Sequence, residues 1–309
     1  MEQSRNKPAI VIICGPTGVG KTAAAIHLAR CRRGEIVSAD SMQVYRFMDI
    51  GTAKPTPEER SAVPHHMIDV AAPDEAFDAA RFAREASAAV DALAARNTPA
   101  FVVGGTGLYI KSLTRGIFHA EAVDPEIRGR LENEADILGP AALHHRLARL
   151  DPEAGRRIHP NDRFRILRAL EVFESTGKPI SDHHSAHRFG ESPFRTLKIG
   201  LEMEREALYE RIDRRVDIMI ETGLLPEVRR LLAMGYHSEL KSMKSIGYRH
   251  MADFIEGRTS WEEAAKTLKR DTRRYAKRQY TWFKADPEVI WTPPAALEEM
   301  NNRIESFLS

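Results

Sequence analysis

Short apolar runs alternate with helical patterns along the first part of the chain and again near its end. The apolar runs lie at residues 9–14, 35–39, 67–70, 100–103, 197–201 and 289–291. Helical patterns follow at residues 21–32, 78–96 and 107–114. Strands alternating with helices in this way predict an α/β fold with a parallel sheet, whose ligands bind at the carboxyl ends of the strands.

Between residues 119 and 190 the pattern is helical and contains no credible strand. Asp124-Pro125-Glu126 opens one helix, and Asn161-Asp162 caps another that covers residues 163–176. Because the strand pattern resumes at residue 197, we predict an inserted helical domain at residues 119–190. Residues 1–118 and 191–309 then form the core with its C-terminal helices.

Two long helices are predicted in the last third of the chain. Residues 204–221 carry Leu208, Ile212, Val216, Met219 and Ile220 on one face, the spacing of an amphipathic helix docked on a core. A second helix begins at Ser260, where Ser260 and Glu263 have the spacing of a capping box, and extends to Lys284.

Composition adds few constraints. The 309 residues are 42% hydrophobic and 29% charged, as in soluble globular proteins, and no stretch approaches the ~20 apolar residues that cross a bilayer. The polar N-terminus is too short for a secretory leader, so we expect a cytoplasmic protein without membrane contact. Cys14 and Cys31 are expected to be reduced.

The most informative motif follows the first apolar run. Residues 15–22 match the P-loop pattern G-x-x-x-x-G-K-[ST], in the strand–turn–helix setting that such a loop requires. Backbone N–H groups of this loop bind phosphate, Lys21 reaches phosphate oxygens, and Thr22 offers a hydroxyl to Mg²⁺. The motif predicts a P-loop NTPase-like core that binds a di- or triphosphate. It does not say which bond breaks.

Two further strand ends carry candidate chemistry. Asp40 follows the second run and is suited to be a general base or a magnesium ligand, although capping the next segment is the alternative; Gln43 is an amide able to pair with a base edge. Thr106 lies in a Gly-Gly-Thr-Gly turn after the run at 100–103. This turn is either a second anion-binding loop or a simple connection between a strand and a helix. Asp69 is an alternative acid for magnesium.

With these motifs the chain resembles the bacterial tRNA dimethylallyltransferase family. The matching blocks are residues 15–22, 40–45, 48–55, 104–109, 158–162, 168–172, 245–249 and 277–283. They span nearly the whole chain in order. A small departure is Val19, where the family often carries Ser; backbone groups bind at this position, so function is not put in doubt.

The resemblance implies transfer of a dimethylallyl group from dimethylallyl diphosphate to N6 of the adenosine 3′-adjacent to the anticodon in tRNA, releasing diphosphate, with Mg²⁺ as cofactor. It implies that Asp40 accepts the amine proton, Thr106 bonds the leaving oxygen, Arg215 neutralises the diphosphate and Thr22 holds the metal. Arg211 and Arg214 share the helix of Arg215, so a solvated basic face is the alternative there. The implied diphosphate-binding residues are Gly15, Pro16, Thr17, Gly18, Val19, Gly20, Lys21 and Thr22.

A tRNA substrate requires the adenosine to be splayed out of the anticodon loop. The resemblance implies tRNA contacts by Asp40, Ser41, Met42, Gln43, Thr106, Arg128, Phe164, Arg165, Arg168, Lys244, Gly247, Tyr248, Arg249, Lys277, Arg278, Gln279 and Trp282. The formal charge of +2 is unevenly distributed along the chain, since residues 266–284 contain many Lys and Arg residues and only one acid, Asp271. Lys266, Arg270, Arg273 or Arg274, and Lys277 recur on one side of the helix, followed by aromatic residues.

Other interpretations stay open. A kinase would share the P-loop but would consume ATP. An enzyme that prenylates free adenine nucleotides would need neither the helical insertion nor the basic helix, and a non-catalytic RNA-binding protein would need no intact Lys21, Thr22 and Asp40. The pairs His144-His145 and His65-His66 and the group His183, His184 and His187 lack a convincing ligand set for a metal. A monomer is expected.

Overall fold

The computed structural model describes residues 7–116, 125–187 and 192–309. The chain divides into two units, Met1–Thr114 with Ser192–Ser309, and Arg115–Glu191, and the described residues of each are compact. The first unit contains the sheet and its helices. The second contains helices only within the described residues. The sequence places its insertion at 119–190.

The first unit is built on a six-stranded sheet with the strand order β3-β2-β4-β1-β5-β6. Every neighbouring pair is parallel, which confirms the predicted fold class. The strands are β1 (Ala9–Cys14), β2 (Glu35–Ser38), β3 (His65–His66), β4 (Ala100–Gly104), β5 (Arg195–Leu201) and β6 (Val289–Thr292). The central strands are buried: Ile10 to Ile13 of β1 are 0% exposed.

The predicted strand at residues 67–70 is wrong. Strand β3 is His65–His66 and ends before Met67. Met67 and Asp69 have φ angles of 63° and 59°, a left-handed conformation that a strand does not accept. Since the apolar residues Met67 and Ile68 suggested this run, composition placed the strand two residues too late.

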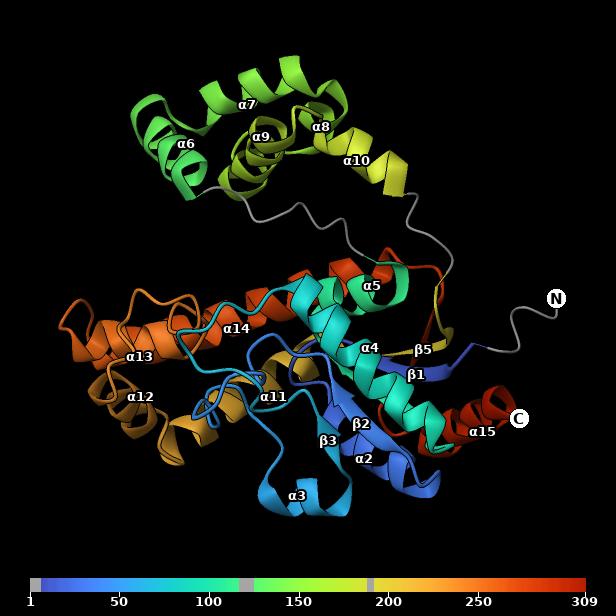
Figure 1. The fold of residues 1–309 in the computed structure, drawn as a ribbon. Helices are drawn as coiled ribbons and strands as arrows, with labels where there is room; N and C mark the ends of the chain where they lie inside the picture. Colours follow the sequence, from blue (N-terminus) through green and yellow to red (C-terminus); the bar gives the residue numbers. More distant parts are fainter. Residues whose placement is uncertain (1–6, 117–124, 188–191) are drawn as a thin grey trace. The chain divides into compact units, whose positions relative to one another are not determined.

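The helices of the first unit cover the sheet and extend beyond it (Figure 1). They are α2 (Lys21–Cys31), α3 (Pro57–Ala62), α4 (Ala79–Ala95), α5 (Gly107–Arg115), α11 (Arg205–Glu221), α12 (Leu224–Ala233), α13 (Tyr248–Ile255), α14 (Trp261–Lys284) and α15 (Leu297–Leu308). The chain crosses from β1 to β2 in one direction along the sheet and from β3 to β4 in the other. Right-handed crossovers therefore put α2 and α4 on opposite faces.

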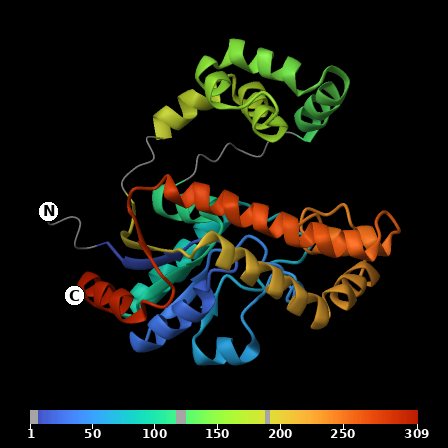
Figure 2. The same ribbon diagram turned by 180° about the vertical axis from the view of Figure 1, so that it is seen from behind.

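Helix α14 is the long helix predicted to begin at Ser260. The Ser260 hydroxyl accepts the N–H of Glu263 at 3.2 Å, which is the serine half of the predicted capping box. Seen from behind in Figure 2, α14 and α11 run along the same side of the unit, and they contact each other. On α11, Leu208, Ile212 and Val216 are buried as predicted, while Met219 and Ile220 are only partly buried.

The second unit packs its helices around a small apolar core that includes Leu131, Leu143, Leu147, Ile166 and Leu170. The helices are α6 (Pro125–Leu138), α7 (Pro140–Leu150), α8 (Pro152–Arg157), α9 (Arg163–Thr176) and α10 (Ile180–His187). The predicted cap is present, since the Asp162 carboxylate accepts the N–H of Arg165 at 3.1 Å. Asp124, the predicted opening residue of α6, lies outside the described residues.

In the parts of the chain that the structure describes, no helix has the length and apolar character needed to cross a membrane.

Candidate active site

The P-loop lies between β1 and α2, at the carboxyl end of the central strand. Gly15 has a φ of +139°, and a Cβ there would come within 2.7 Å of the Leu201 carbonyl oxygen on β5. Only glycine fits this backbone and this close approach. Lys21 and Thr22 form the first turn of α2, whose N–H groups have no acceptor inside the helix and therefore face the loop. These N–H groups at the start of α2 can therefore bind an anion.

Lys21 is the cation of this loop. Its Nζ donates to the carbonyl oxygens of Gly15, at 2.9 Å, and Pro16, at 2.8 Å. Burial lowers the pKa of Lys21 to about 8, with Asp40 raising it and Arg215 lowering it further. A phosphate group bound in this loop would supply negative charge and so favour the protonated amine.

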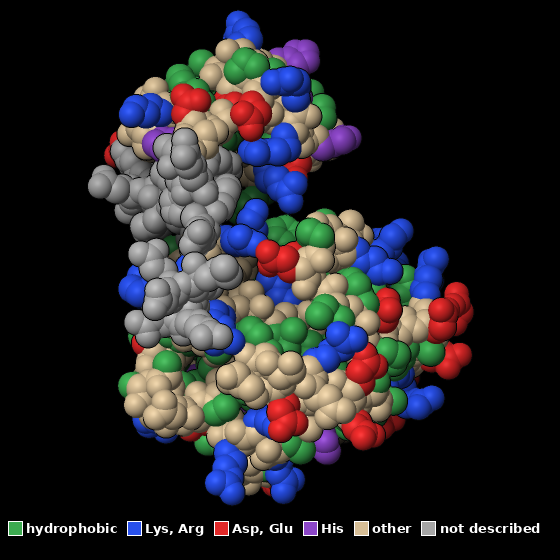
Figure 3. Space-filling view, turned by 90° about the vertical axis from the view of Figure 1, so that its right-hand side faces the viewer, with side chains coloured by type: hydrophobic (Ala, Val, Ile, Leu, Met, Phe, Trp, Pro, Cys, Tyr) green, Lys and Arg blue, Asp and Glu red, His purple; other side chains and the backbone are tan. Residues whose placement is uncertain are grey.

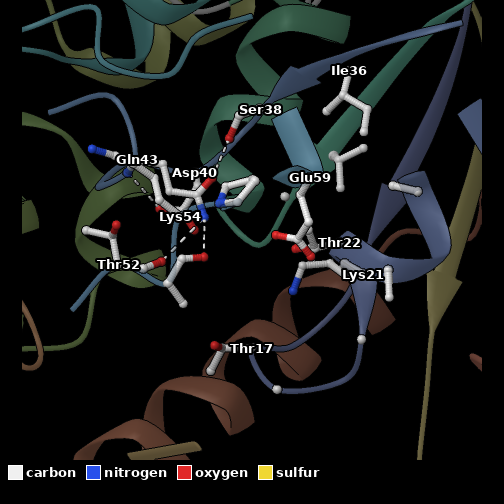
Figure 4. A pocket seen from close by; sticks show the side chains of 18 of the residues that line it. Thr17, Lys21, Thr22, Ile36, Ser38, Asp40, Gln43, Thr52, Lys54 and Glu59 are labelled. Atoms are coloured by element: carbon white, nitrogen blue, oxygen red, sulfur yellow. Dashed lines mark hydrogen bonds between the residues drawn. The ribbon is translucent and has the colours of Figure 1, made fainter. Parts of the chain in front are cut away.

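A pocket of about 370 Å³ opens beside the P-loop. Figure 4 shows Thr17, Lys21 and Thr22 on one side of it and Ser38, Asp40 and Gln43 on the other. Helix α11 adds Arg211 and Arg215, and α14 adds Tyr275 and Gln279. The predicted phosphate site and the predicted base therefore share one cavity.

Asp40 uses one oxygen to hold its own loop. Its Oδ1 accepts the N–H groups of Met42, at 2.9 Å, and Gln43, at 3.3 Å, which is the capping role considered from the sequence. No residue in the described ranges is hydrogen-bonded to its Oδ2. The carboxylate can thus fix the loop and still accept a proton from a substrate.

Thr106 is brought to Asp40 by the close approach of the ends of β2 and β4. A Cβ on Gly104 would lie 2.1 Å from the Ala39 carbonyl oxygen, so this contact requires glycine. The Thr106 N–H donates to Ala39 at 3.2 Å, and its Oγ1 accepts the Ser41 N–H at 3.0 Å. Ser41 and Thr106, which are 65 positions apart in the sequence, therefore lie together on one rim of the site, the Thr106–Asp40 rim.

The Gln43 amide is held by the chain itself. Its Oε1 accepts the Ser38 hydroxyl at 3.0 Å, and its Nε2 lies 3.4 Å from the Thr52 oxygen and 3.3 Å from the Ala53 oxygen. Gln43 lines the pocket in this arrangement. Pairing with a base edge, as predicted from its residue type, would exchange the longer of these bonds for bonds to the base.

The three candidate arginines on α11 differ in whether they line the pocket. Arg211 and Arg215 are four residues apart and line the pocket, whereas Arg214 is exposed and does not. Burial lowers the pKa of Arg215, Asp40 raises it, and Arg211 lowers it again. The charge of Arg215 is thus directed at the same space as Lys21 and Asp40.

Tyr275 and Lys54 are among the pocket residues that were not anticipated from the sequence. Burial raises the pKa of Tyr275 to about 12, as does the Asp40 charge, while hydrogen bonds with Thr106 and Gln279 act the other way. The only signal in the sequence is that Tyr275 stands one helical turn before Gln279. The role of Lys54, in turn, depends on a loop conformation that no local pattern specifies.

Lys54 is buried among oxygens. Its side chain is 1% exposed, and its Nζ donates to the Tyr45 carbonyl, at 2.7 Å, and to the carboxylates of Asp49, at 2.7 Å, and Asp69, at 2.6 Å. Burial would raise the pKa of Asp69, but Lys54 and Arg60 hold it below its usual value. Asp69, an alternative magnesium acid from the sequence, is therefore committed to two cations.

A buried carboxylate fixes the adjoining loop. Glu227 on α12 accepts the N–H groups of Asp49, Ile50 and Gly51 at 2.9–3.2 Å and the Tyr248 hydroxyl at 2.6 Å. Glu227 is 5% exposed. This contact ties the loop after Gln43 to helices α12 and α13.

Replacing Glu227 by Leu is expected to lower the free energy of unfolding by about 3–5 kcal/mol, because three buried N–H groups and a hydroxyl lose their acceptor. Tyr248→Phe removes one donor and should cost about 1–2 kcal/mol. The exposed Glu221 provides the control, since Glu221→Gln should change stability by less than about 0.5 kcal/mol. Denaturant titration measures all three, and an unchanged Glu227→Leu midpoint would remove the assigned role.

The structure shows which basic residues of the α14 stripe are exposed and which are paired with a neighbouring helix. Arg273 bonds Asp213 on α11, and Lys269 bonds Asp217, so both are tied to a neighbouring helix. The exposed members are Lys266, Arg270, Arg274 and Lys277, and the neighbouring Arg278 is exposed as well. Arg274, not Arg273, therefore completes the stripe. Arg270 and Arg274 lie 3.1 Å and 3.7 Å from Asp271 on their own helix. Trp282 is 41% exposed and packs where a Cβ on Gly107 would lie.

The other predicted tRNA residues of the first unit divide by burial. Lys244 and Arg249 are exposed, and Arg249 is ion-paired with Asp271. Gly247, Tyr248 and Gln279 are buried, and Gln279 lines the pocket. On the face drawn in Figure 3, basic and acidic side chains are interspersed rather than gathered in one patch.

In the second unit, Phe164 and Arg165 are exposed, with 67% of Phe164 accessible. Arg128 donates to Glu132 at 2.6 Å and Glu171 at 2.7 Å, and Arg168 lies 3.3 Å from Glu171. These two arginines are partly neutralised within their own unit.

Within the described ranges no group of three or more His, Cys, Asp and Glu side chains is placed to hold a metal. His144 contacts the carbonyl oxygens of Gly155 and Ile158, and His65 contacts that of Val63. His183 contacts Thr176. The side chains of His184 and His187 lie outside the described set.

Known proteins resemble this chain over nearly its whole length. The model of the IPP transferase family matches residues 43–286. A tRNA dimethylallyltransferase of Desulfosudis oleivorans is 55% identical over 303 residues, which cover 98% of this chain and 96% of that protein. One of Syntrophobacter fumaroxidans is 57% identical over 295 residues, covering 96% and 86%.

Solved structures agree with the sequence relatives. The full-length tRNA isopentenylpyrophosphate transferase of Bacillus halodurans superposes with a TM-score of 0.73 at 42% identity, covering 98% of this chain and 97% of that one. A eukaryotic dimethylallyltransferase acting on tRNA gives a TM-score of 0.78 at 28% identity, covering 96% and 77%.

Proposed function

Because the chain belongs to the IPP transferase family, we propose that it transfers a dimethylallyl group from dimethylallyl diphosphate to N6 of the adenosine 3′-adjacent to the anticodon in tRNA. The products are N6-prenylated tRNA and diphosphate. The observation that carries the proposal is the shared pocket, in which a P-loop and Arg215 face Asp40. Because tRNA is the proposed substrate, we place the reaction in the cytoplasm. We also propose that the chain acts as a monomer.

In the proposed reaction the P-loop N–H groups and Lys21 bind the donor's diphosphate. The N6 lone pair forms a bond to C1 of the dimethylallyl group, and the C1–O bond breaks with its electron pair leaving on diphosphate. Asp40 Oδ2 accepts the proton that N6 loses, because an adenine amine is a weak nucleophile. Arg215, with Lys21, stabilises the charge on the leaving group. The Thr106 hydroxyl donates to Ser41 Oγ at 3.3 Å in this structure and donates to the leaving oxygen instead when the donor is bound.

Magnesium fits the phosphate end of this pocket. Thr22 lies in the first turn of α2 and lines the cavity, where a hydroxyl and phosphate oxygens supply the hard ligands that Mg²⁺ prefers. When bound there, Mg²⁺ supplies positive charge to the diphosphate. The protein alone supplies few ligands for the metal, so we expect Mg²⁺ to bind together with dimethylallyl diphosphate.

The direct test is incubation with Mg²⁺, dimethylallyl diphosphate and either unmodified tRNA or AMP, followed by analysis for N6-prenylated adenosine. We expect product with tRNA only, release of diphosphate and no consumption of ATP. Product with AMP would favour a nucleotide prenyltransferase. Turnover of ATP without prenylation would favour a kinase.

The α14 stripe predicts a strong salt dependence of tRNA binding. Replacing Arg270, Arg274 and Lys277 by Ala should weaken binding at low salt and reduce the slope of log K against log[salt] by about 0.7–0.9 for each phosphate that the variant no longer binds. Filter binding across a salt series measures this slope. Arg303→Ala on α15 removes an exposed positive charge outside α14 and should leave the slope unchanged. An unchanged slope in the triple variant would exclude the stripe from the RNA interface.

A further inference from the structure

Gln279 joins two loops of the pocket from the buried side of α14. Its side chain accepts the Thr17 N–H through Oε1 at 2.8 Å and donates to the Gly105 carbonyl oxygen through Nε2 at 2.9 Å. The residue is 6% exposed. A Cβ on Gly105 would lie 2.1 Å from this Nε2, so the two groups are in tight contact.

The two bonds connect two loops that take part in the proposed reaction. Thr17 belongs to the P-loop, where the diphosphate binds, and Gly105 precedes Thr106 in the loop after β4. Thr106 in turn accepts the N–H of Ser41, the neighbour of Asp40. One planar amide therefore links the P-loop to the Thr106 loop, which in turn holds the segment that carries Asp40, across 262 and 174 residues of sequence.

We infer that Gln279 is a positioning residue, which sets the distance between the diphosphate cradle and the Thr106–Asp40 rim. The inference rests on the proposed function. It differs from the tRNA contact that the resemblance implies for Gln279, because both amide atoms are bonded to the chain and the side chain is buried. The exposed neighbours on α14 remain available to RNA.

The chemistry of the two bonds requires an amide. A glutamine accepts with its oxygen and donates with its nitrogen, whereas an ionised glutamate only accepts and a methionine does neither usefully. A protonated glutamate, however, accepts with one oxygen and donates with the other. Because burial raises the pKa of a carboxyl group, a glutamate at this position should protonate near neutral pH.

The inference is tested with Gln279→Met and Gln279→Glu. Gln279→Met should lower kcat for tRNA prenylation about 10- to 100-fold, as for misplaced reacting groups, and should weaken binding of inorganic diphosphate, measured by calorimetry. Gln279→Glu should be impaired at about pH 8 and recover relative to wild type towards pH 6, where the carboxyl group is protonated. Gln279→Met should show no such recovery.

Thr281→Ala, on the exposed side of the same helix, is the control expected to match wild type. Thermal melting identifies any variant that fails to fold, and the pH recovery of Gln279→Glu is a readout that a purely structural role would not produce. Wild-type kcat and diphosphate affinity in Gln279→Met, or a pH-independent defect in Gln279→Glu, would overturn the inference. The diphosphate affinities test it without turnover, so a wild-type protein that prenylates no tRNA would refute the proposed function separately.

Discussion

Replacing Asp40 by Asn is expected to lower kcat for tRNA prenylation by about 10²–10⁴-fold, the range for loss of a general base. Asparagine keeps an oxygen that can accept the Met42 and Gln43 N–H groups, so the loop should hold its shape. It has no basic oxygen for the N6 proton. Single-turnover measurements with saturating donor report the chemical step, and tRNA affinity should be nearly unchanged.

Two variants bracket this experiment. Asp40→Ala removes the loop hydrogen bonds as well as the base, so it should lower both turnover and stability. Asp74→Asn removes an exposed carboxylate from the loop before α4 and should behave as wild type. Turnover by Asp40→Asn at the wild-type rate would show that Asp40 serves only to cap its loop.

Arg215→Ala is expected to lower kcat by about 10²–10³-fold, because a cation aimed at the leaving group is removed from the pocket. Arg214→Ala is a matched control one residue away on α11, exposed and outside the pocket, and should retain wild-type turnover. The measurement is the rate of diphosphate release in the presence of tRNA.

The comparison of these two neighbours separates catalysis from bulk charge. Equal losses in Arg214→Ala and Arg215→Ala would indicate a solvated basic face that acts on tRNA binding. A loss confined to Arg215→Ala supports its role at the diphosphate. Arg215→Lys should recover part of the rate, since it keeps the charge but not the planar group.

The parts of the site that sequence could place are those that belong to short strand–turn segments. The P-loop, Asp40 and Thr106 each follow a strand directly, and parallel strands deliver such residues to one edge of the sheet. The pocket brings the first two together, and the Ser41–Thr106 contact adds the third. The family resemblance supplied the substrate, which none of these residues specifies alone.

The remaining features depend on partners distant in sequence. Helical periodicity could not choose between Arg273 and Arg274, because the choice is made by Asp213 on α11. The burial of Tyr248 is decided by Glu227, and that of Gln279 by loops at Thr17 and Gly105. Strand β3 was misplaced because left-handed residues interrupt an apolar run.

The central claim is that the P-loop grips the diphosphate of a prenyl donor while Asp40 faces the base that attacks it. A crystal structure with a tRNA anticodon stem-loop and an unreactive thiolodiphosphate analogue of the donor tests this directly. We predict the diphosphate against the N–H groups of Gly18 to Thr22, with Asp40 Oδ2 about 3 Å from N6 of an everted adenosine. A P-loop that holds another part of either ligand, with Asp40 turned away from the base, would contradict the account.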